Sequence, residues 1–383
     1  MECQMVRKVV LLGTVAAYTI NFRGDLIRAL VAEGYDTYCL CTDFDEDSKA
    51  IVVEMGANPI TYCLSRAGMN PFADLYSIIN IKKILEKIKP DAVISFVVKP
   101  VIYGSIAARL AGVKHRYAML EGLGYVFTDL ASGLSFKQKL LRKIQVFLYR
   151  LALPCIDKLI FLNHDDPADL LEKHNLKAKS VHVLGGIGLN LEDYPFSPAP
   201  VAPVRFLFIG RLLAEKGIFE YVEAARLVKQ QYPGAQFVVL GGLDEENPGG
   251  LKREALNQLL SEGIIEYPGH VNNVSDWIAG SSVFVLPSYR EGMPRSTQEA
   301  MAMGRAVITS DAPGCREAVE QGVNGFIVPR WNVQALAEKM IYLIENPSEI
   351  TRMGNESHRI AVDKFDANKV NQRLMEILEL KTS

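Results

Sequence analysis

The sequence lacks the features that mark several classes of protein. It has no excess of charge of one sign, since 42 Lys and Arg face 44 Asp and Glu and the formal net charge is −2. No overall positive field is therefore available to attract nucleic acid. The first apolar run, around Val9 to Leu12, is too short to span a bilayer and no small-residue cleavage site follows it. Any anionic partner must be bound by a local basic patch.

Cysteine is also scarce and unpatterned. No two of the six cysteines form a CxxC pair, and no Cys/His array has zinc-ligand spacing; the six are Cys3, Cys39, Cys41, Cys63, Cys155 and Cys315. This predicts reduced thiols in a cytosolic protein without a metal site. No GxGxxG follows the first strand, which argues against a NAD-dependent dehydrogenase. The acidic cluster Asp43, Asp45 and Asp47 in TDFDEDSK is typical of a solvated turn.

Short apolar runs alternate with segments of helical period along the whole chain. In the first half the predicted strands are VRKVVLLG, YDTYCLC, ANPITYCL, DAVISFV, KHRYAML, DKLIFLN and SVHVLGG. In the second half they are VRFLFIG, AQFVVLGG, IIEYPG, SVFVLPS, RAVITS and FIVP. Runs that are apolar on both faces indicate parallel strands covered by helices on each side. The sequence therefore predicts an α/β protein.

A proline-rich stretch, YPFSPAPVAPV, interrupts the alternation and predicts an extended linker. Two βα arrays of similar length flank it, which favours two Rossmann-like domains. We expect an N-terminal domain over residues 1–195, a linker over 196–204 and a C-terminal domain over 205–363. A last helix, about 364–383, is expected to pack back on the first domain.

Polar residues directly after strands carry the functional argument, because open α/β sheets bind ligands beyond the carboxyl ends of their strands. VRFLFIG continues into Gly210, Arg211 and, five residues later, Lys216. Gly217 then lets the chain enter a helix closely. The two cations could converge on one anion, with the arginine binding it bidentately. Solvated surface cations beside a loop are the alternative at this point.

A second strand, SVFVLPS, is followed by YREGMPRSTQEA. Pro294 suits the first turn of a helix, whose N-terminus would offer the backbone N–H groups between Met293 and Ser296 to a phosphate. Glu291 precedes this helix and Glu299 lies on it. Carboxylates accept hydrogen bonds from sugar and ribose hydroxyls. For Glu291, helix capping or an ion pair remains the alternative.

Together GRLLAEKG, EGMPRSTQEA and the segment AMAMGRAVITSDAPGCREAVEQGVNGFIVP resemble the retaining GT-B glycosyltransferases of family 4. The likeness is very specific over residues 205–330 and weaker over 1–195. It implies a GT-B fold, in which two facing Rossmann-like domains leave an inter-domain cleft. It also implies a metal-independent enzyme without a cofactor, in which cations take the place of the metal ion of other folds.

The resemblance assigns roles to matching residues. Arg211 and Lys216 would hold the donor diphosphate, Glu291 the donor sugar and Glu299 the ribose, with Glu291, Arg211 and Lys216 as the catalytic set. The expected donor-binding residues are Gly210, Arg211, Lys216, His270, Val271, Glu291, Gly292, Met293, Pro294, Arg295 and Glu299. His270 and Val271 would pass the nucleobase, although His270 in an exposed loop can equally be without a role.

The resemblance further implies retention of anomeric configuration through front-face attack, and an acceptor site in the N-terminal domain. Gly13 and a loop from Thr14 to Arg23 should reach that site, with Asn21 and Arg23 as polar candidates. Many relatives carry a histidine after a middle strand of this domain. Glu121 stands there instead, and becomes the candidate for a sugar or base contact. His115 is expected at the start of the same strand.

A basic amphipathic helix is predicted around residues 136–151. No acidic residue occurs between Asp129 and Asp157. On a helical wheel one face is apolar, and it holds Phe136, Leu140, Leu141, Ile144, Phe147, Leu148 and Leu151. The other side is cationic, with Lys139, Arg142, Lys143 and Arg150. This pattern favours contact with an anionic membrane surface, the alternative being an ordinary helix packed on the domain.

The resemblance therefore implies a retaining glycosyltransferase. It would move a hexose or N-acetylhexosamine from a nucleotide sugar, expected to be a UDP-sugar, to a polyprenyl-diphosphate-linked sugar in surface-glycan synthesis. It would act in the cytoplasm, at the inner face of the cytoplasmic membrane, and bind no nucleic acid. The alternatives are an NDP-sugar epimerase of GT-B architecture and a non-catalytic nucleotide-sugar binding module.

Overall fold

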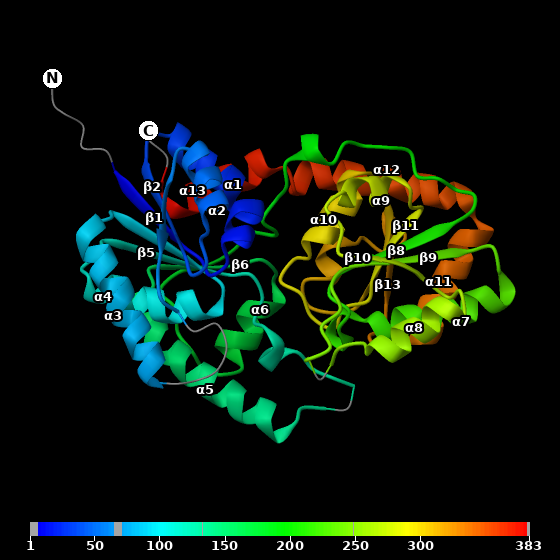
Figure 1. Cartoon of the computed structure of the whole chain (residues 1–383), viewed down its shortest axis with the longest axis horizontal. Coiled ribbons are helices and arrows are strands. Elements are labelled where there is room, and N and C mark those ends of the chain that lie inside the picture. Colours follow the sequence, from blue (N-terminus) through cyan, green and yellow to red (C-terminus); the bar gives the residue numbers. More distant parts are fainter. Residues whose placement is uncertain (1–6, 65–70, 132, 248, 381–383) are drawn as a thin grey trace. The chain divides into compact units, whose positions relative to one another are not determined.

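The structure is a computed structural model that describes residues 7–64, 71–131, 133–247 and 249–380 (Figure 1). The chain divides into two compact units. Unit 1 comprises Met1–Phe127, Ser135–Ile187 and Ala367–Ser383, and unit 2 comprises Thr128–Leu134 and Gly188–Asp366. The chain passes into unit 2 at Gly188, so the proline-rich stretch 194–204 belongs to unit 2. There it forms neither helix nor strand, and the Phe196 ring contacts the His358 ring in a tilted arrangement with the centroids 4.8 Å apart.

Unit 1 is built on a parallel sheet of order β3-β2-β1-β4-β5-β6-β7. Its strands are β1 (Lys8–Leu12), β2 (Asp36–Cys41), β3 (Asn58–Thr61), β4 (Ala92–Phe96), β5 (His115–Leu120), β6 (Lys158–Phe161) and β7 (Val181–Val183). Its helices are α1 (Ala16–Ala32), α2 (Glu46–Glu54), α3 (Pro71–Ile88), α4 (Ser105–Leu110), α5 (Phe136–Ala152), α6 (Asp165–Pro167) and α13 (Ala367–Leu378).

Unit 2 holds a second parallel sheet, of order β10-β9-β8-β11-β12-β13. Its strands are β8 (Arg205–Ile209), β9 (Gln236–Leu240), β10 (Glu266–Gly269), β11 (Val283–Leu286), β12 (Ala306–Ser310) and β13 (Gly325–Val328). Its helices are α7 (Ile218–Gln231), α8 (Arg253–Ser261), α9 (Val274–Ala279), α10 (Arg295–Ala302), α11 (Val333–Glu345) and α12 (Pro347–Lys364).

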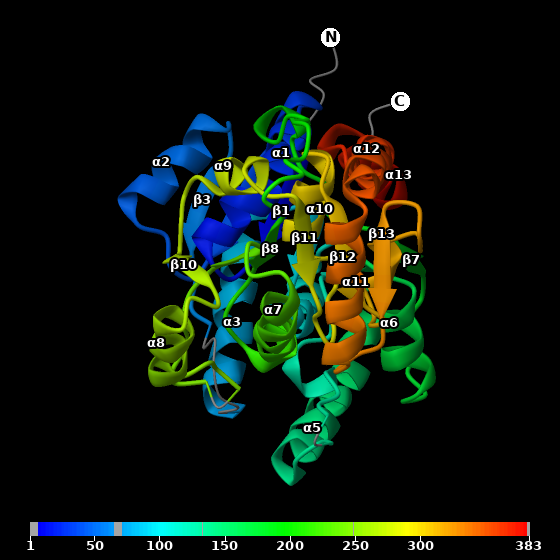
Figure 2. The same ribbon diagram turned by 90° about the vertical axis from the view of Figure 1, so that its right-hand side faces the viewer.

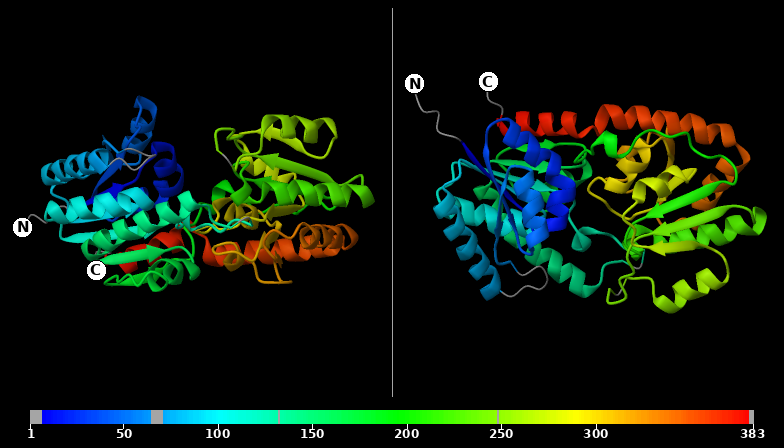
Figure 3. Two further views of the ribbon diagram at one scale, coloured as in Figure 1. Left: turned by 90° about the horizontal axis from the view of Figure 1, so that it is seen from below. Right: turned by 45° about the horizontal axis from the view of Figure 1, so that its top comes forward.

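The strands form where the apolar runs predicted them, and all thirteen are present. Every residue of the central strands β4, β11 and β12 is buried, because helices flank each sheet (Figures 2 and 3). In unit 2, α7 packs against α11 and α10 packs against α12. Because helices cover both faces of each sheet, these strands have continuous apolar sequences and not sequences in which apolar and polar residues alternate.

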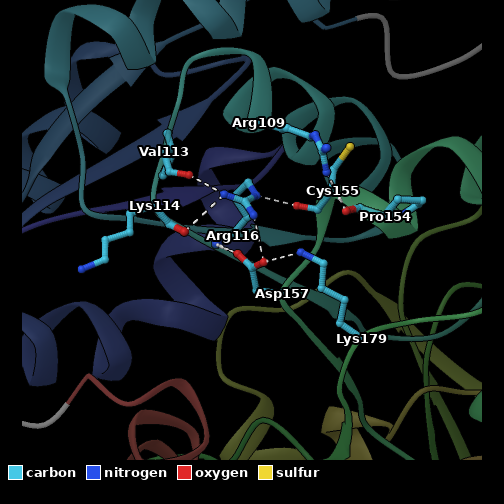
Figure 4. A network of polar contacts seen from close by, with 8 residues as sticks. All are labelled: Arg109, Val113, Lys114, Arg116, Pro154, Cys155, Asp157 and Lys179. Atoms are coloured by element: carbon cyan, nitrogen blue, oxygen red, sulfur yellow. Dashed lines mark hydrogen bonds and ion pairs between the residues drawn. The ribbon is translucent and has the colours of Figure 1, made fainter.

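In unit 1 a network of polar contacts connects the chain segments at the amino ends of β5 and β6 (Figure 4). Arg116 donates to the Cys155 carbonyl at 2.7 Å and to Asp157 at 2.8 Å, and Lys179 also reaches Asp157 at 2.8 Å. Burial raises the pKa of Asp157, but the hydrogen bonds and charges of Lys179 and Arg116 outweigh it and leave that pKa lowered. This network lies at the opposite end of the strands from the predicted site, so its role is to join the strands.

Candidate functional site

The residues predicted to bind the donor diphosphate and sugar, Gly210, Arg211, Lys216 and Glu291, gather at the switch point of the unit 2 sheet. From the neighbouring strands β8 and β11 the chain winds outward in opposite directions, to β9 and to β12. Ligands of open α/β sheets bind beyond the carboxyl ends of such a strand pair. Gly210 follows β8 there, and Ser288 lies shortly after β11. The sheet topology thus brings GRLLAEKG and YREGMP to one edge.

Gly217 fixes the close approach of these two segments. Its φ is +77°, a conformation that other residues adopt only with strain. A Cβ at this position would lie 2.2 Å from the Pro287 carbonyl oxygen, so no larger side chain fits. The Tyr289 N–H also donates to the Glu215 carbonyl at 2.9 Å. Lys216 is therefore held beside the turn that carries Glu291.

Lys216 and Glu291 form an ion pair with two hydrogen bonds. Lys216 Nζ lies 2.6 Å from Glu291 Oε1 and 2.8 Å from Oε2. Ser288, which sequence reasoning did not single out, donates its hydroxyl to Glu291 Oε1 at 2.7 Å. The exposed fractions of the lysine and glutamate side chains are 24% and 10%. The ion pair is thus present without a ligand, and its lysine is more accessible to solvent than its glutamate.

Arg211 lies at the same sheet edge but its side chain is 59% exposed. Its guanidinium approaches Asp244 at 3.8 Å, a distance for a weak surface ion pair. Lys216 and Arg211 therefore have different surroundings: the lysine is held by a buried partner, whereas the arginine side chain reaches into solvent.

Glu299 is buried on α10 between two donors. Its Oε1 lies 3.0 Å from the Tyr194 hydroxyl and 3.2 Å from Arg295 Nε. Arg295 also donates to the Gly188 carbonyl at 2.9 Å. Burial raises the pKa of Glu299, while Arg295 and Tyr194 act in the opposite direction. Tyr194 was assigned to the linker in sequence, and no local pattern marked it as a partner of a residue 105 positions away.

The start of α10 differs slightly from prediction. Pro294 is the N-cap, with φ −65° and ψ 124°, and not a residue of the first turn. Proline has no N–H, so the N–H groups at this helix end come from its neighbours. Gly292, Met293 and Pro294 are all buried, and a Cβ on Gly314 would lie 2.3 Å from the Glu291 carbonyl oxygen.

His270 and Val271 follow β10, the edge strand on the β9 side of the sheet. The Gly269 carbonyl before them accepts from the Gly241 N–H at 2.9 Å, which ties their loop to the end of β9. His270 is exposed and Val271 is half-buried.

In unit 1 the structure corrects the predicted loop from Thr14 to Arg23. Helix α1 begins at Ala16, so Asn21 and Arg23 are helical and only residues 13–15 follow β1 as a loop. The early start has a physical cause: the Asp43 carboxylate accepts the Ala16 N–H at 2.8 Å and caps the helix from a neighbouring strand end. Asp43 is thus more than part of a solvated turn.

Arg23 and Glu121, predicted separately, form an ion pair at the carboxyl ends of β4 and β5. The Arg23 side chain is 6% exposed and lies 4.5 Å above the Phe96 ring, at the end of β4. Gly13 joins the same edge, where its carbonyl accepts from Tyr62 at 2.6 Å, while Asn21 is exposed on α1. Here too the switch point, between β1 and β4, carries the polar residues.

Helix α5 forms as predicted but packs differently. Its buried residues are Gln138, Val146, Tyr149 and Ala152. The predicted apolar face is only partly covered, because Phe136, Leu140, Phe147 and Leu151 are exposed. Lys139, Lys143 and Arg150 are exposed as expected. Arg142 departs from the prediction: it turns inward, donates to the Val126 carbonyl at 2.7 Å and stacks over Phe127.

Within the part of the chain that the structure describes, no three His, Cys, Asp or Glu side chains gather in a way that could hold a metal ion. None of its helices is both long and apolar enough to pass through a membrane.

Comparison with known proteins agrees with this arrangement. Residues 8–163 match a family model described as glycosyl transferase 4-like, and residues 192–359 match one described as glycosyl transferases group 1. An N,N′-diacetylbacillosaminyl-diphospho-undecaprenol α-1,3-N-acetylgalactosaminyltransferase of Campylobacter jejuni is 29% identical over 96% of this chain and 97% of its own length. A UDP-Gal:α-D-GlcNAc-diphosphoundecaprenol α-1,3-galactosyltransferase of Escherichia coli is 26% identical over 71% of each chain.

Solved structures show the same fold. Sucrose-phosphate synthase from Thermosynechococcus elongatus superposes with a TM-score of 0.79 at 18% identity, over 97% of this chain and 98% of its own. The Anabaena protein Alr3699/HepE in complex with UDP gives 0.74 at 18% identity, over 97% and 99%. The predicted α/β fold of GT-B type, with two Rossmann-like domains, is confirmed. The chain belongs to the glycosyltransferases, with a glycosyl transferase 4-like domain followed by a glycosyl transferases group 1 domain.

Proposed function

We propose that this enzyme is a retaining glycosyltransferase that moves a hexose or N-acetylhexosamine from a UDP-sugar to a polyprenyl-diphosphate-linked sugar in surface-glycan synthesis. The Lys216–Glu291 pair at the switch point of unit 2 carries the proposal, because it offers a cation for a diphosphate and a carboxylate for a sugar side by side. The names of the Campylobacter and Escherichia coli relatives, which include diphospho-undecaprenol acceptors, support the choice of acceptor.

In the proposed donor complex the diphosphate takes the place of Glu291 as partner of Lys216. Arg211, with its exposed guanidinium, reaches the same diphosphate. Glu291 stays hydrogen-bonded to Ser288 and turns its carboxylate to hydroxyls of the donor sugar. Gly292 to Arg295 line the sugar and phosphate, Glu299 accepts from the ribose, and His270 and Val271 pass the base.

The proposed chemical step is a front-face displacement. The acceptor hydroxyl oxygen forms a bond to the anomeric carbon as the bond from that carbon to the diphosphate oxygen breaks. The acceptor proton passes to the departing diphosphate. Negative charge grows on the leaving group, so fixed cations lower the barrier by acting where charge develops. Lys216 and Arg211 fill this role, and we propose that no metal ion or other cofactor takes part.

On the acceptor side we propose that Arg23 and Glu121 act as one unit. The buried arginine fixes the carboxylate of Glu121 at the end of β5, next to the switch point of unit 1. Glu121 then accepts a hydrogen bond from a sugar hydroxyl, with Gly13 at the end of β1 and Asn21 exposed on α1 as further acceptor contacts. His115 lies at the amino end of β5 and has no part in this proposal.

We further propose that unit 1 docks on the anionic inner face of the cytoplasmic membrane. The exposed side of α5 combines four large apolar side chains with cations and has no acidic residue, namely Phe136, Leu140, Phe147 and Leu151 with Lys137, Lys139, Lys143 and Arg150. Helix α3 adds a second exposed apolar stripe at helical spacing: Phe72, Leu75, Tyr76 and Ile79. Figures 1 and 2 show the start of α3 and α5 at the same lower end of unit 1.

A turnover screen tests the function. Purified protein is incubated with UDP-, GDP- and ADP-sugars, with and without a polyprenyl-diphosphate sugar, in buffer and in EDTA. We expect acceptor-dependent release of UDP that EDTA leaves unchanged, and a product with the donor's anomeric configuration. Conversion of UDP-sugar without acceptor would identify an epimerase or hydrolase instead. Tight UDP binding with no turnover on any acceptor would identify a binding module.

A further inference from the structure

A phenol–carboxylate pair lies beside the proposed donor site and has no role in it so far. The Tyr289 hydroxyl donates to Glu220 Oε1 at 2.6 Å. Glu220 lies in the first turn of α7, four residues after Lys216, and Tyr289 lies two residues before Glu291. The pair therefore links the same two chain segments that the Lys216–Glu291 ion pair links.

Loss of the Tyr289–Glu220 hydrogen bond would be destabilising, because the atoms that form it lie in poorly solvated surroundings. Tyr289 is 5% exposed, and its ring meets Trp331 edge-on at 5.7 Å. Among the described residues, Glu220 Oε2 is buried and has no hydrogen-bond partner. Burial raises the pKa of Glu220, and burial followed by the bond to Glu220 raises that of Tyr289. A half-buried acid whose second carboxylate oxygen is buried without a partner is destabilising by itself, so its presence calls for a compensating role.

The role that we assign to this bond concerns the donor-bound state of the enzyme. When the diphosphate takes Lys216, the ion pair that joins the two segments in the unliganded enzyme is lost. The segments are then still joined by the Tyr289–Glu220 bond at 2.6 Å, by the Tyr289 N–H bond to the Glu215 carbonyl at 2.9 Å, and by a longer contact of the Ser288 hydroxyl with the Lys216 carbonyl at 3.5 Å. The Tyr289–Glu220 bond is the shortest of these contacts, and none of them uses the Lys216 ammonium or the Glu291 carboxylate.

We propose that Tyr289 and Glu220 are positioning residues that hold the turn carrying Glu291 in register with Lys216 in the donor-bound state. The inference rests on the proposed function, since it requires a nucleotide sugar at Lys216 and Glu291. It adds two residues that lie outside the GRLLAEKG and EGMPRSTQEA motifs and that are not proposed to touch the donor.

The experiment distinguishes a positioning role, which changes KM and kcat, from a purely structural role, which changes only the melting temperature. Tyr289→Phe removes the hydroxyl and should raise the KM for UDP-sugar about three- to tenfold and lower kcat, the effect of one hydrogen bond. Glu220→Gln keeps an acceptor oxygen and should retain most activity. The double variant Tyr289→Phe with Glu220→Met replaces both partners by apolar groups, which removes the unpaired buried acid. Its melting temperature should recover, while its KM and kcat stay impaired.

Tyr232→Phe is the matched control, because Tyr232 makes the same kind of bond to Glu345 at the far end of α7 on the exposed surface. It should behave as wild type. Kinetics of Tyr289→Phe equal to wild type, or full recovery of KM and kcat in the double variant, would overturn the inference. Failure of the proposed function looks different, because neither the wild type nor any variant would then bind UDP. Loss of UDP binding in Lys216→Ala together with wild-type KM and kcat in Tyr289→Phe would uphold the donor site and refute only the positioning role.

Discussion

Lys216 and Glu291 are 75 residues apart in the chain and yet share two hydrogen bonds. Each residue was predicted at the donor site from its own motif, and the motif spacing agrees with the sheet edge on which both lie. Their pairing could not be predicted, because it depends on the approach of Gly217 to Pro287. The same holds for Arg23 and Glu121. Sequence patterns located these four residues, and the tertiary contacts decided that they form two pairs.

Lys216→Ala and Glu291→Ala should each reduce kcat/KM for the UDP-sugar by about 100-fold or more, the usual scale for removing a group that acts on developing charge. The double variant should lose about the product of the two single losses, because in the proposed donor complex the two residues contact different parts of the donor. Steady-state kinetics of the three variants measure the coupling between them. Lys364→Ala, which breaks an exposed 3.4 Å pair with Glu320, is the control and should keep full activity. A double variant that loses little more than either single one would show that Lys216 and Glu291 stay paired when the donor is bound.

At the scale of elements, α5 shows what helical period can and cannot predict. The period and the capping box of Ser135 and Gln138 specify a helix from Phe136. The helix has apolar residues on more than one side, so the sequence alone does not select the packed face. The packed face of α5 is determined by two tertiary contacts, the hydrogen bond of Arg142 to the Val126 carbonyl and the burial of Tyr149. As a result the stripe from Phe136 to Leu151 remains exposed.

That exposed face predicts binding to anionic vesicles. Lys139→Glu, Lys143→Glu and Arg150→Glu together should weaken binding to vesicles of phosphatidylglycerol and phosphatidylcholine at least about a hundredfold, since each cation near such a surface contributes about 1 kcal/mol. Arg142 is left intact because it holds a loop. Flotation on a density gradient measures binding, and added salt should weaken it for the wild type.

The vesicle experiment has a charge-matched control in Lys252→Glu, Arg253→Glu and Lys369→Glu, which are exposed elsewhere. This control should float like the wild type. Phe136→Ser with Phe147→Ser, which changes no charge, should also reduce flotation because it removes apolar contact. Equal flotation of all variants would mean that α5 does not meet the membrane.

At the scale of the whole molecule, unit 1 contains both β1 and α13, which are the first strand and the last helix of the described residues. Helix α13 packs against α1, and side chains of unit 1 bind the carbonyl groups at its end. Lys158 donates to Ile377 at 2.6 Å, Tyr117 to Leu378 at 2.8 Å and Tyr35 to Leu380 at 2.6 Å. These bonds satisfy carbonyls that the helix itself leaves without partners. The amphipathic pattern of this segment predicts a helix, but it does not identify the three donors.

Tyr117→Phe should therefore destabilise unit 1 and leave the nucleotide site unchanged. Burial, then the charges of Glu379 and Asp157, raises the pKa of Tyr117 to about 12, so its hydroxyl is a donor at neutral pH. Its loss leaves a buried carbonyl without that partner and should cost about 1–2 kcal/mol, or a melting temperature lower by about 2–6 °C. Differential scanning calorimetry and UDP titration of the same sample measure both quantities, with the exposed Tyr76→Phe as control. UDP affinity should stay at the wild-type value, because the residues proposed to bind UDP all lie in unit 2. A fall in UDP affinity that accompanies the lower melting temperature would instead mean that α13 supports the donor site as well as unit 1.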